Sequence, residues 1–311
     1  MFLNYKQLIR RREVRLRILS ALSWLPDTWM VRLQYKLHTG RTLRLKNPQR
    51  FTEKLQHYKC FYRNPLLFQI VDKASLRDYL DVKGLGEYSV PLVGIFDSLE
   101  EINPEDLPRQ FVIKTTSGGG STEVYVCRNF DAAAWDEINS RFGHLLRKRL
   151  GKSPGREWAY YGIDKPRLVV EELLCDPGCP EADLVDYKFF CFGGIPRFCQ
   201  VITDRSTNEH IDFYDTDWHR LLGVVGLNVS AANSPMAQPR PIHYEEMLDL
   251  AAKLSRPFPF VRVDLYNVAG KIYVGELTFY PASGYGGFIP DSFDFELGKL
   301  FDINYVSIVN D

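Results

Sequence analysis

Apolar residues recur at helical spacing early in the chain and at shorter, strand-like spacing later. From residue 51 to about 81 the pattern predicts helices, with Thr52 and Asp72 as N-cap residues. After Gly84 the pattern changes to short apolar runs bounded by turn residues, which predict strands. A further helix is expected over 131–150, where large apolar residues share one face.

The predicted strands fall into neighbouring groups joined by turns. The expected strands are 89–95, 111–114, 123–127, 167–174, 186–192, 196–203, 211–214, 260–266 and 271–279. A helix over 244–254 precedes the last two, which are expected to form a hairpin. Because hairpins alternate with flanking helices, the sequence predicts an α+β fold.

Composition is that of an ordinary soluble globular protein. The 311 residues are 45% hydrophobic and 25% charged, a length at which two lobes are expected. No apolar run reaches the roughly 18 residues needed to cross a bilayer, which argues against an integral membrane protein. Six scattered cysteines in a chain of this size are expected to be reduced, which predicts a cytoplasmic location.

Charge is distributed unevenly. Residues 1–59 contain 14 Lys or Arg and three acids, a net charge of +11, and the remainder carries −11. Within 8–25 an apolar stripe faces an arginine cluster, a pattern typical of an interfacial helix on anionic lipid or acidic glycan. A solvated basic face on a helix packed against the main body is an equally open interpretation.

A glycine-rich segment lies between two predicted strands. It consists of Ser117, Gly118, Gly119, Gly120 and Ser121, and Lys114 lies in the strand before it. Backbone N-H groups in such a loop can lie over phosphates, although neither the Walker nor the dinucleotide-binding spacing is present. A flexible turn is the alternative interpretation.

Two acids lie on the predicted C-terminal hairpin. Strand pairing is expected to bring Asp264 and Glu276 together on one face, an arrangement that suits Mg²⁺ ions holding phosphate oxygens. On another strand, alternation places Asp186 and Lys188 on the same face. Simple salt bridges, for example with Arg262, are the alternative.

The ordered combination of several motifs resembles the TupA-like ATP-grasp proteins of bacterial polysaccharide gene clusters. The resemblance covers roughly residues 35–300. The motifs are Phe51-Thr-Glu-Lys54, Asp72-Lys73, Phe111-Val-Ile-Lys114, Asp186–Gly194, Thr203-Asp-Arg205, Phe213–Trp218 and Glu276–Pro281.

The resemblance implies an ATP-grasp fold of two α+β lobes gripping ATP and Mg²⁺. The segments expected from it are a basic helical segment (1–50), an N-terminal helical subdomain (51–105), a small lobe with the glycine-rich loop (106–174) and a C-terminal lobe with the metal site (175–311). It implies that Lys73 and Lys114 hold phosphates beneath the loop and that Lys188 faces the triphosphate.

The remaining implied roles concern the base, the metal and the reacting groups. Adenine is expected near Glu171, Glu172, Leu173 and Leu174, and ribose near Asp186. Asp264, Glu276 and Thr278 are the expected metal ligands, with Thr278 at a position where many ATP-grasp enzymes have Asn. Arg262 is expected to stabilise developing charge, and Arg205 to contact an acidic substrate.

The implied reaction is ATP-dependent carboxylate–amine ligation through an acyl phosphate, joining an amino compound to a sugar-acid carboxylate in cell-surface polysaccharide (capsule) synthesis. The expected partners are an acidic glycan or sugar acid and an amine, with peripheral membrane contact through the basic N-terminus and no nucleic acid. A kinase acting on a glycan hydroxyl, a glycosyltransferase using Asp215-Thr-Asp217, and a catalytically idle scaffold that binds glycan or lipid are the alternatives.

Overall fold

The computed structural model describes residues 14, 19, 21–118, 123–147 and 155–304. Its helices are α3 (Asp27–Thr39), α4 (Phe51–Phe61), α5 (Leu66–Val71), α6 (Lys73–Val82), α7 (Ala132–Leu146), α8 (Tyr244–Ser255) and α9 (Asp291–Leu300). Its strands are β1 (Leu92–Phe96), β2 (Phe111–Thr115), β3 (Val124–Cys127), β4 (Leu168–Glu172), β5 (Asp186–Phe192), β6 (Ile195–Thr203), β7 (His210–Asp215), β8 (Val225–Gly226), β9 (Phe260–Val268), β10 (Lys271–Thr278) and β11 (Phe288–Ile289).

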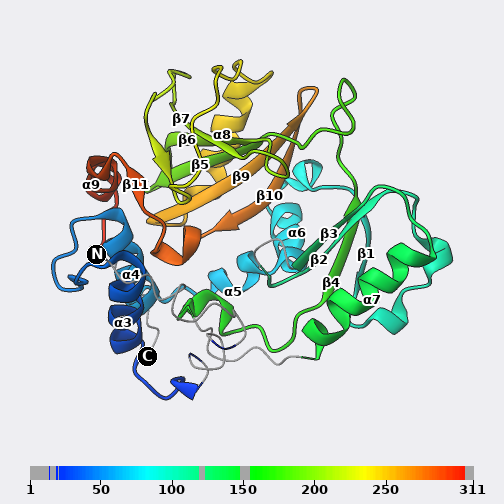
Figure 1. Ribbon diagram of the computed structural model, residues 1–311, viewed down its shortest axis with the longest axis horizontal. Coiled ribbons are helices and arrows are strands. Elements are labelled where there is room, and N and C mark those ends of the chain that lie inside the picture. The colour runs from blue at the N-terminus through cyan, green and yellow to red at the C-terminus, as the bar shows by residue number, and fades with distance from the viewer. Residues whose placement is uncertain (1–13, 15–18, 20, 119–122, 148–154, 305–311) are drawn as a thin grey trace.

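Two antiparallel sheets organise the molecule (Figure 1). One has the strand order β1-β4-β2-β3 and the other the order β10-β9-β5-β6-β7. Antiparallel sheets covered by helices confirm the predicted α+β class. Strand β1, from the predicted 51–105 subdomain, pairs with β4 of the predicted small lobe. The four domain boundaries themselves stay predictions.

Each sheet is covered by a helix. Helix α7 packs Ile138 and Phe142 against Phe111 and Ile113 of β2, forming the core of the four-stranded sheet. Helix α8 contacts β5, β6 and β9 of the five-stranded sheet, where a second core is rich in phenylalanine. Helices α5 and α6 lie between the two sheets (Figure 1).

The two sheets are joined by hydrogen bonds around α6. The backbone N-H of Lys73, at the start of α6, donates to Thr116 O just beyond β2 at 2.8 Å. A short parallel bridge pairs Ser89 with Val274 of β10. Helix α6 therefore holds the glycine-rich end of β2 toward the β9–β10 hairpin.

Two local predictions need correction. Thr52 does not cap α4, because the helix begins at Phe51 and the hydroxyl of Thr52 donates to Asp294 of α9. Glu53 instead accepts the backbone N-H of Arg50. The predicted strand at 89–95 begins only at Leu92, after a 3₁₀ turn and Pro91, which has no N-H to donate. The predicted cap at Asp72 is confirmed, since its carboxylate accepts the N-H of Ser75.

No helix among the described residues is long and apolar enough to span a bilayer. Most of the predicted interfacial helix in 8–25 lies outside the described residues. The basic residues of the described range 21–59 differ in burial and pairing. Lys59 is fully buried and Arg50 pairs with Asp291 and Asp294, whereas Arg32 and Lys36 are exposed.

Candidate active site

The β9–β10 hairpin aligns the two predicted metal acids. Asp264 and Glu276 are directly paired in the register, which confirms the expected juxtaposition. The pairing starts at the turn of the hairpin tip, where Gly270 has φ +92° and its N-H donates to the Asn267 side chain. A register shift between Val274 and Glu276 then brings Glu276 opposite Asp264. On the other side of β9, Lys188 of β5 is paired with Asp264.

Arg262 binds both acids. Its Nε and one terminal nitrogen donate to the two carboxylate oxygens of Asp264 at 2.7 and 2.6 Å, and that nitrogen lies 3.4 Å from Glu276. The same nitrogen donates to the hydroxyl of Thr278 at 3.2 Å, and this hydroxyl donates to Glu276 at 3.0 Å. The structure therefore brings Arg262 and the three predicted metal ligands into one cluster.

Glu276 is held in its ionised form. Burial alone would raise the pKa of its carboxyl, but the positive charges of Lys73, Arg262 and Lys188 outweigh burial and bring the pKa to about 2. A carboxylate ionised at all physiological pH values, beside a second carboxylate and a hydroxyl, is a set of hard oxygen donors. Such a set fits Mg²⁺.

A second cluster surrounds Asp186. Its carboxylate lies 3.3 Å from the ammonium of Lys188 and 3.0 Å from the guanidinium of Arg205, while Lys188 also donates to Asp264 at 2.7 Å. Burial would lower the pKa of Arg205, but the charges of Asp186, Asp264 and Glu209 and the nearby Tyr266 together outweigh burial and raise that pKa. Lys188 and Arg205 therefore both contact the carboxylate of Asp186, which is the predicted ribose ligand. The side chain of Arg205 is half-exposed.

The lysines predicted to hold phosphates come from α6 and β2. Lys73 donates to Gly118 O, and burial lowers the pKa of its ammonium despite the nearby charge of Glu276. Lys114 lies 2.6 Å from Glu171, whose other oxygen lies 3.3 Å from Arg77. Both lysines therefore lie at the junction of the two sheets, each with a protein partner.

Only part of the glycine-rich loop is described. Gly119, Gly120 and Ser121 lie outside the described residues, whereas Ser117 and Gly118 are visible. A Cβ at Gly118 would lie 1.6 Å from the carboxylate of Glu123 and 2.2 Å from the hydroxyl of Thr115, so a larger residue there would displace these side chains.

The predicted adenine segment leaves the end of β4. Glu171 and Glu172 are its last strand residues, with Glu171 buried and Glu172 exposed, and the N-H of Glu172 donates to Pro91 O. Leu173 and Leu174 follow as half-buried residues in the connection to β5. Roles toward adenine at these positions stay predictions.

A cluster beside the site was not predicted from the sequence. The fully buried ammonium of Lys59 donates to Ser283 O at 2.6 Å, to the Ser283 hydroxyl at 2.9 Å and to Gly155 O at 3.0 Å. The Ser283 hydroxyl donates to Glu157. Ser283 lies seven positions after Glu276, in a turn where Ala282 and Ser283 have φ values of 47° and 53°. Two successive left-handed non-glycine residues indicate a strained backbone held by its surroundings.

This cluster is linked electrostatically to Glu276. Burial raises the pKa of Tyr160 well above its usual value, and the charges of Glu157 and Glu276 raise this pKa further. The sequence signal for the cluster was the run Pro281-Ala-Ser-Gly284 directly after the Glu276 motif. The sequence contains no signal for the role of Lys59, because a lysine on an amphipathic helix normally predicts a solvated face.

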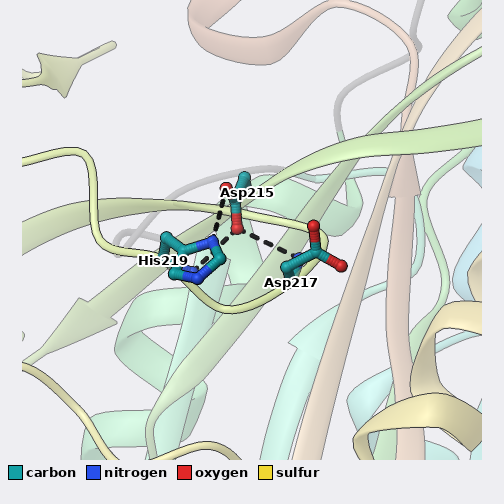
Figure 2. Close-up of side chains that lie close together, drawn as sticks. All are labelled: Asp215, Asp217 and His219. Carbon is teal, nitrogen blue, oxygen red and sulfur yellow. Dashed lines mark hydrogen bonds and ion pairs between the residues drawn. The ribbon is translucent and has the colours of Figure 1, made fainter.

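Asp215, Asp217 and His219 form a separate group (Figure 2). Their ligand atoms lie within 4.8 Å of one another. One oxygen of Asp215 accepts the backbone N-H groups of Asp217 and His219, and the other lies 3.1 Å from the His219 ring. Trp218 stacks on Tyr214 with ring centroids 4.3 Å apart. Asp215 therefore organises a packed turn, which favours a structural role over a D-x-D metal site.

The lobes, the hairpin acids and the lysines at their junction together define an ATP-grasp fold. A family model described as TupA-like ATPgrasp matches residues 53–302. The chain therefore belongs to the TupA-like ATP-grasp family. No curated protein matches the chain.

Three solved structures with similarity to the chain are ligases. The D-alanine–D-alanine ligase of Bacillus anthracis is 17% identical, with a TM-score of 0.45 over 75% of this chain and 65% of the ligase. That of Helicobacter pylori is 14% identical, with a TM-score of 0.39 over 81% of this chain and 68% of the ligase. The ATP-grasp ligase PsnB, in complex with a minimal precursor, Mg and ADP, is 15% identical, with a TM-score of 0.37 over 73% of this chain and 57% of PsnB. These values are too low to transfer an activity.

Proposed function

We propose that this protein is an ATP-dependent carboxylate–amine ligase that joins an amino compound to the carboxylate of a sugar acid in cell-surface polysaccharide synthesis. The observation that carries the proposal is the cluster of Arg262, Asp264, Glu276 and Thr278 facing Lys73 across the junction of the lobes. Membership in the TupA-like ATP-grasp family supports ATP as the co-substrate.

The cations and acids have complementary tasks in this reaction. Lys73, Lys114 and Lys188 are proposed to hold phosphate oxygens, and Asp264 and Glu276 to hold Mg²⁺, with Thr278 contributing its hydroxyl. Bound there, Mg²⁺ would neutralise phosphate charge and orient the terminal phosphoryl group. Arg262 contacts both acids, so it is positioned to stabilise charge on the transferred group.

The chemistry then needs two displacements. A substrate carboxylate oxygen bonds to the terminal phosphorus as the bond to ADP breaks, which gives an acyl phosphate. An amine attacks the acyl carbon, loses a proton, and expels phosphate to leave an amide. The half-exposed Arg205, paired with Asp186, is the proposed contact for the acidic substrate.

A binding test separates this proposal from the nucleotide-sugar alternative. Mg-ATP is expected to raise the melting temperature of the wild type, and Lys114→Ala to lose most of that rise, because a ligand that binds only the folded state stabilises it. Lys253→Ala, on α8, is the matched control and should keep the rise. Stabilisation by UDP-sugars but not by ATP would contradict the proposal.

A product test separates ligase from kinase. With a uronic acid labelled with oxygen-18 in its carboxylate and an amine, a ligase releases phosphate that carries one labelled oxygen. A kinase acting on a hydroxyl releases no free phosphate in the transfer. Hydroxylamine in place of the amine should yield a hydroxamate from the acyl phosphate. ADP production with a phosphorylated sugar and no labelled phosphate would refute amide formation.

A further inference from the structure

Helix α3 has one buried face and one apolar face in solvent. Its inner residues Met30, Val31 and Tyr35 are fully buried. Its outer residues Trp29, Leu33 and Leu37 are 64%, 43% and 40% exposed. These three follow each other at intervals of four, so they form one row along the helix.

A second exposed tryptophan and a set of cations lie close to this row along the chain. Trp24, just before α3, is 75% exposed. Arg32 and Lys36 lie on the same side of the helix as the apolar row, at helical spacing from Trp29, and both are exposed. We refer to Trp24, Trp29, Arg32, Leu33, Lys36 and Leu37 as the α3 outer face.

The surroundings of the α3 outer face are strongly basic. Residues 28–52 contain six Lys or Arg and no acid, although the whole chain has no net charge. Arg44 and Lys46 are exposed beyond the end of the helix, and Arg41 pairs with Asp291. Exposed tryptophans in a cationic setting are the composition of a surface that lies at a lipid–water interface.

From this arrangement we propose that the α3 outer face docks the protein on the surface of an anionic phospholipid bilayer. Trp24 and Trp29 would enter the headgroup region while Arg32 and Lys36 meet lipid phosphates. A second copy of the chain is a poorer occupant, because a two-fold contact would place the same cations against each other. The segment 1–20 is also basic, with six Lys or Arg against one acid, so its charge does not complement this face.

Co-sedimentation of the full chain with vesicles tests the proposal. Binding is expected to vesicles of phosphatidylcholine and phosphatidylglycerol in equal parts, to be weak with phosphatidylcholine alone, and to fall as salt is added. Trp29→Ser with Leu37→Ser should weaken binding about tenfold, and Arg32→Glu with Lys36→Glu by about as much. Leu222→Ser with Met236→Ser is the matched control, because these side chains are 76% and 77% exposed elsewhere, and it should bind like wild type.

Three results would overturn the proposal. One is equal binding to neutral and anionic vesicles, another is wild-type binding by both α3 variants. The third is a dimer in sedimentation equilibrium that Trp29→Ser with Leu37→Ser dissolves, which would make a second copy the occupant. Circular dichroism checks that the variants fold, and the readout is independent of ATP turnover.

Discussion

Lys59 allows a sharp test of the electrostatics beside the candidate active site. Its side chain is fully buried, and burial lowers its pKa from the usual 10.5 to about 8, against partial compensation by Glu157 at 4.0 Å. At ~1.4 kcal/mol per pKa unit, keeping this lysine charged in the folded protein costs roughly 3 kcal/mol. The perturbation is Lys59→Met, which keeps the length and removes the charge.

The sign of the pH effect follows from proton counts. Between pH 8 and 10.5 the unfolded chain binds a proton at Lys59 that the folded chain has released, so the free energy of unfolding of the wild type rises with pH in that window. Below about pH 8 both states are protonated and the contribution is constant. Lys59→Met lacks this rise.

At pH 7 two effects of the substitution oppose each other. The cost of the buried charge disappears, but Ser283 O, the Ser283 hydroxyl and Gly155 O lose their donor, at about 1 to 3 kcal/mol for each group left unsatisfied. The pH dependence is therefore more diagnostic than the stability at any one pH.

The assay is urea unfolding of both proteins from pH 7 to 10.5. The wild type is expected to gain roughly 3 kcal/mol relative to Lys59→Met across this range. Lys299→Met, an exposed lysine on α9, should follow the wild-type curve. Parallel curves for the wild type and Lys59→Met would refute the claim that burial disfavours the charge of Lys59.

Three further predictions concern the site and its supports. Glu276→Gln should abolish Mg²⁺-dependent stabilisation by ATP. The wild type is expected to hold about 1 kcal/mol of stability from this carboxylate above pH 4.5 and to lose it as the pH falls toward 2, and the variant should lack it. This free energy is reduced because the Glu276 side chain is 40% exposed, and acid and urea titrations measure it. Asp215→Asn should leave the ATP-induced melting shift unchanged, and a loss of that shift would implicate its turn in nucleotide binding. Arg156→Met should lower the free energy of unfolding by about 2 to 4 kcal/mol, because its buried guanidinium binds Leu22 O, Ser23 O and Asp27; a change under about 1 kcal/mol would contradict this.

The hairpin part of the site follows from the sequence because its interactions are local. The turn at Asn267 and Gly270 starts the strand pairing, and a one-residue shift of register between Val274 and Glu276 then brings Glu276 opposite Asp264. Alternation along β5 places Lys188 with Asp186. Arg262 could be placed beside Asp264 for the same reason, two residues away on one strand face.

The rest of the site depends on contacts between distant segments. Lys59 meets Ser283 across 224 positions, and Thr52 meets Asp294 across 242. Local pattern assigns a lysine to a solvated face and a threonine at a helix start to a cap, so it predicts neither contact. The exposed row on α3 was missed for a related reason. Periodicity predicts an amphipathic helix, but only the packing shows that Met30 and Val31 are buried while Trp29 and Leu33 are not.

The cations at the lobe junction are already paired with acids, and in the proposed ligase this pairing would link the metal and nucleotide sites. Lys114 contacts Glu171, and Lys188 and Arg262 both contact Asp264. If Asp264 binds Mg²⁺ as proposed, its contacts with Lys188 and Arg262 would loosen, and those two cations would become available to phosphate oxygens. Each binding event would then lower the cost of the other, because the charge that one removes from the protein is the charge that the other requires. In the proposed ligase, a site built from paired charges in this way would favour Mg²⁺ and ATP together over either alone.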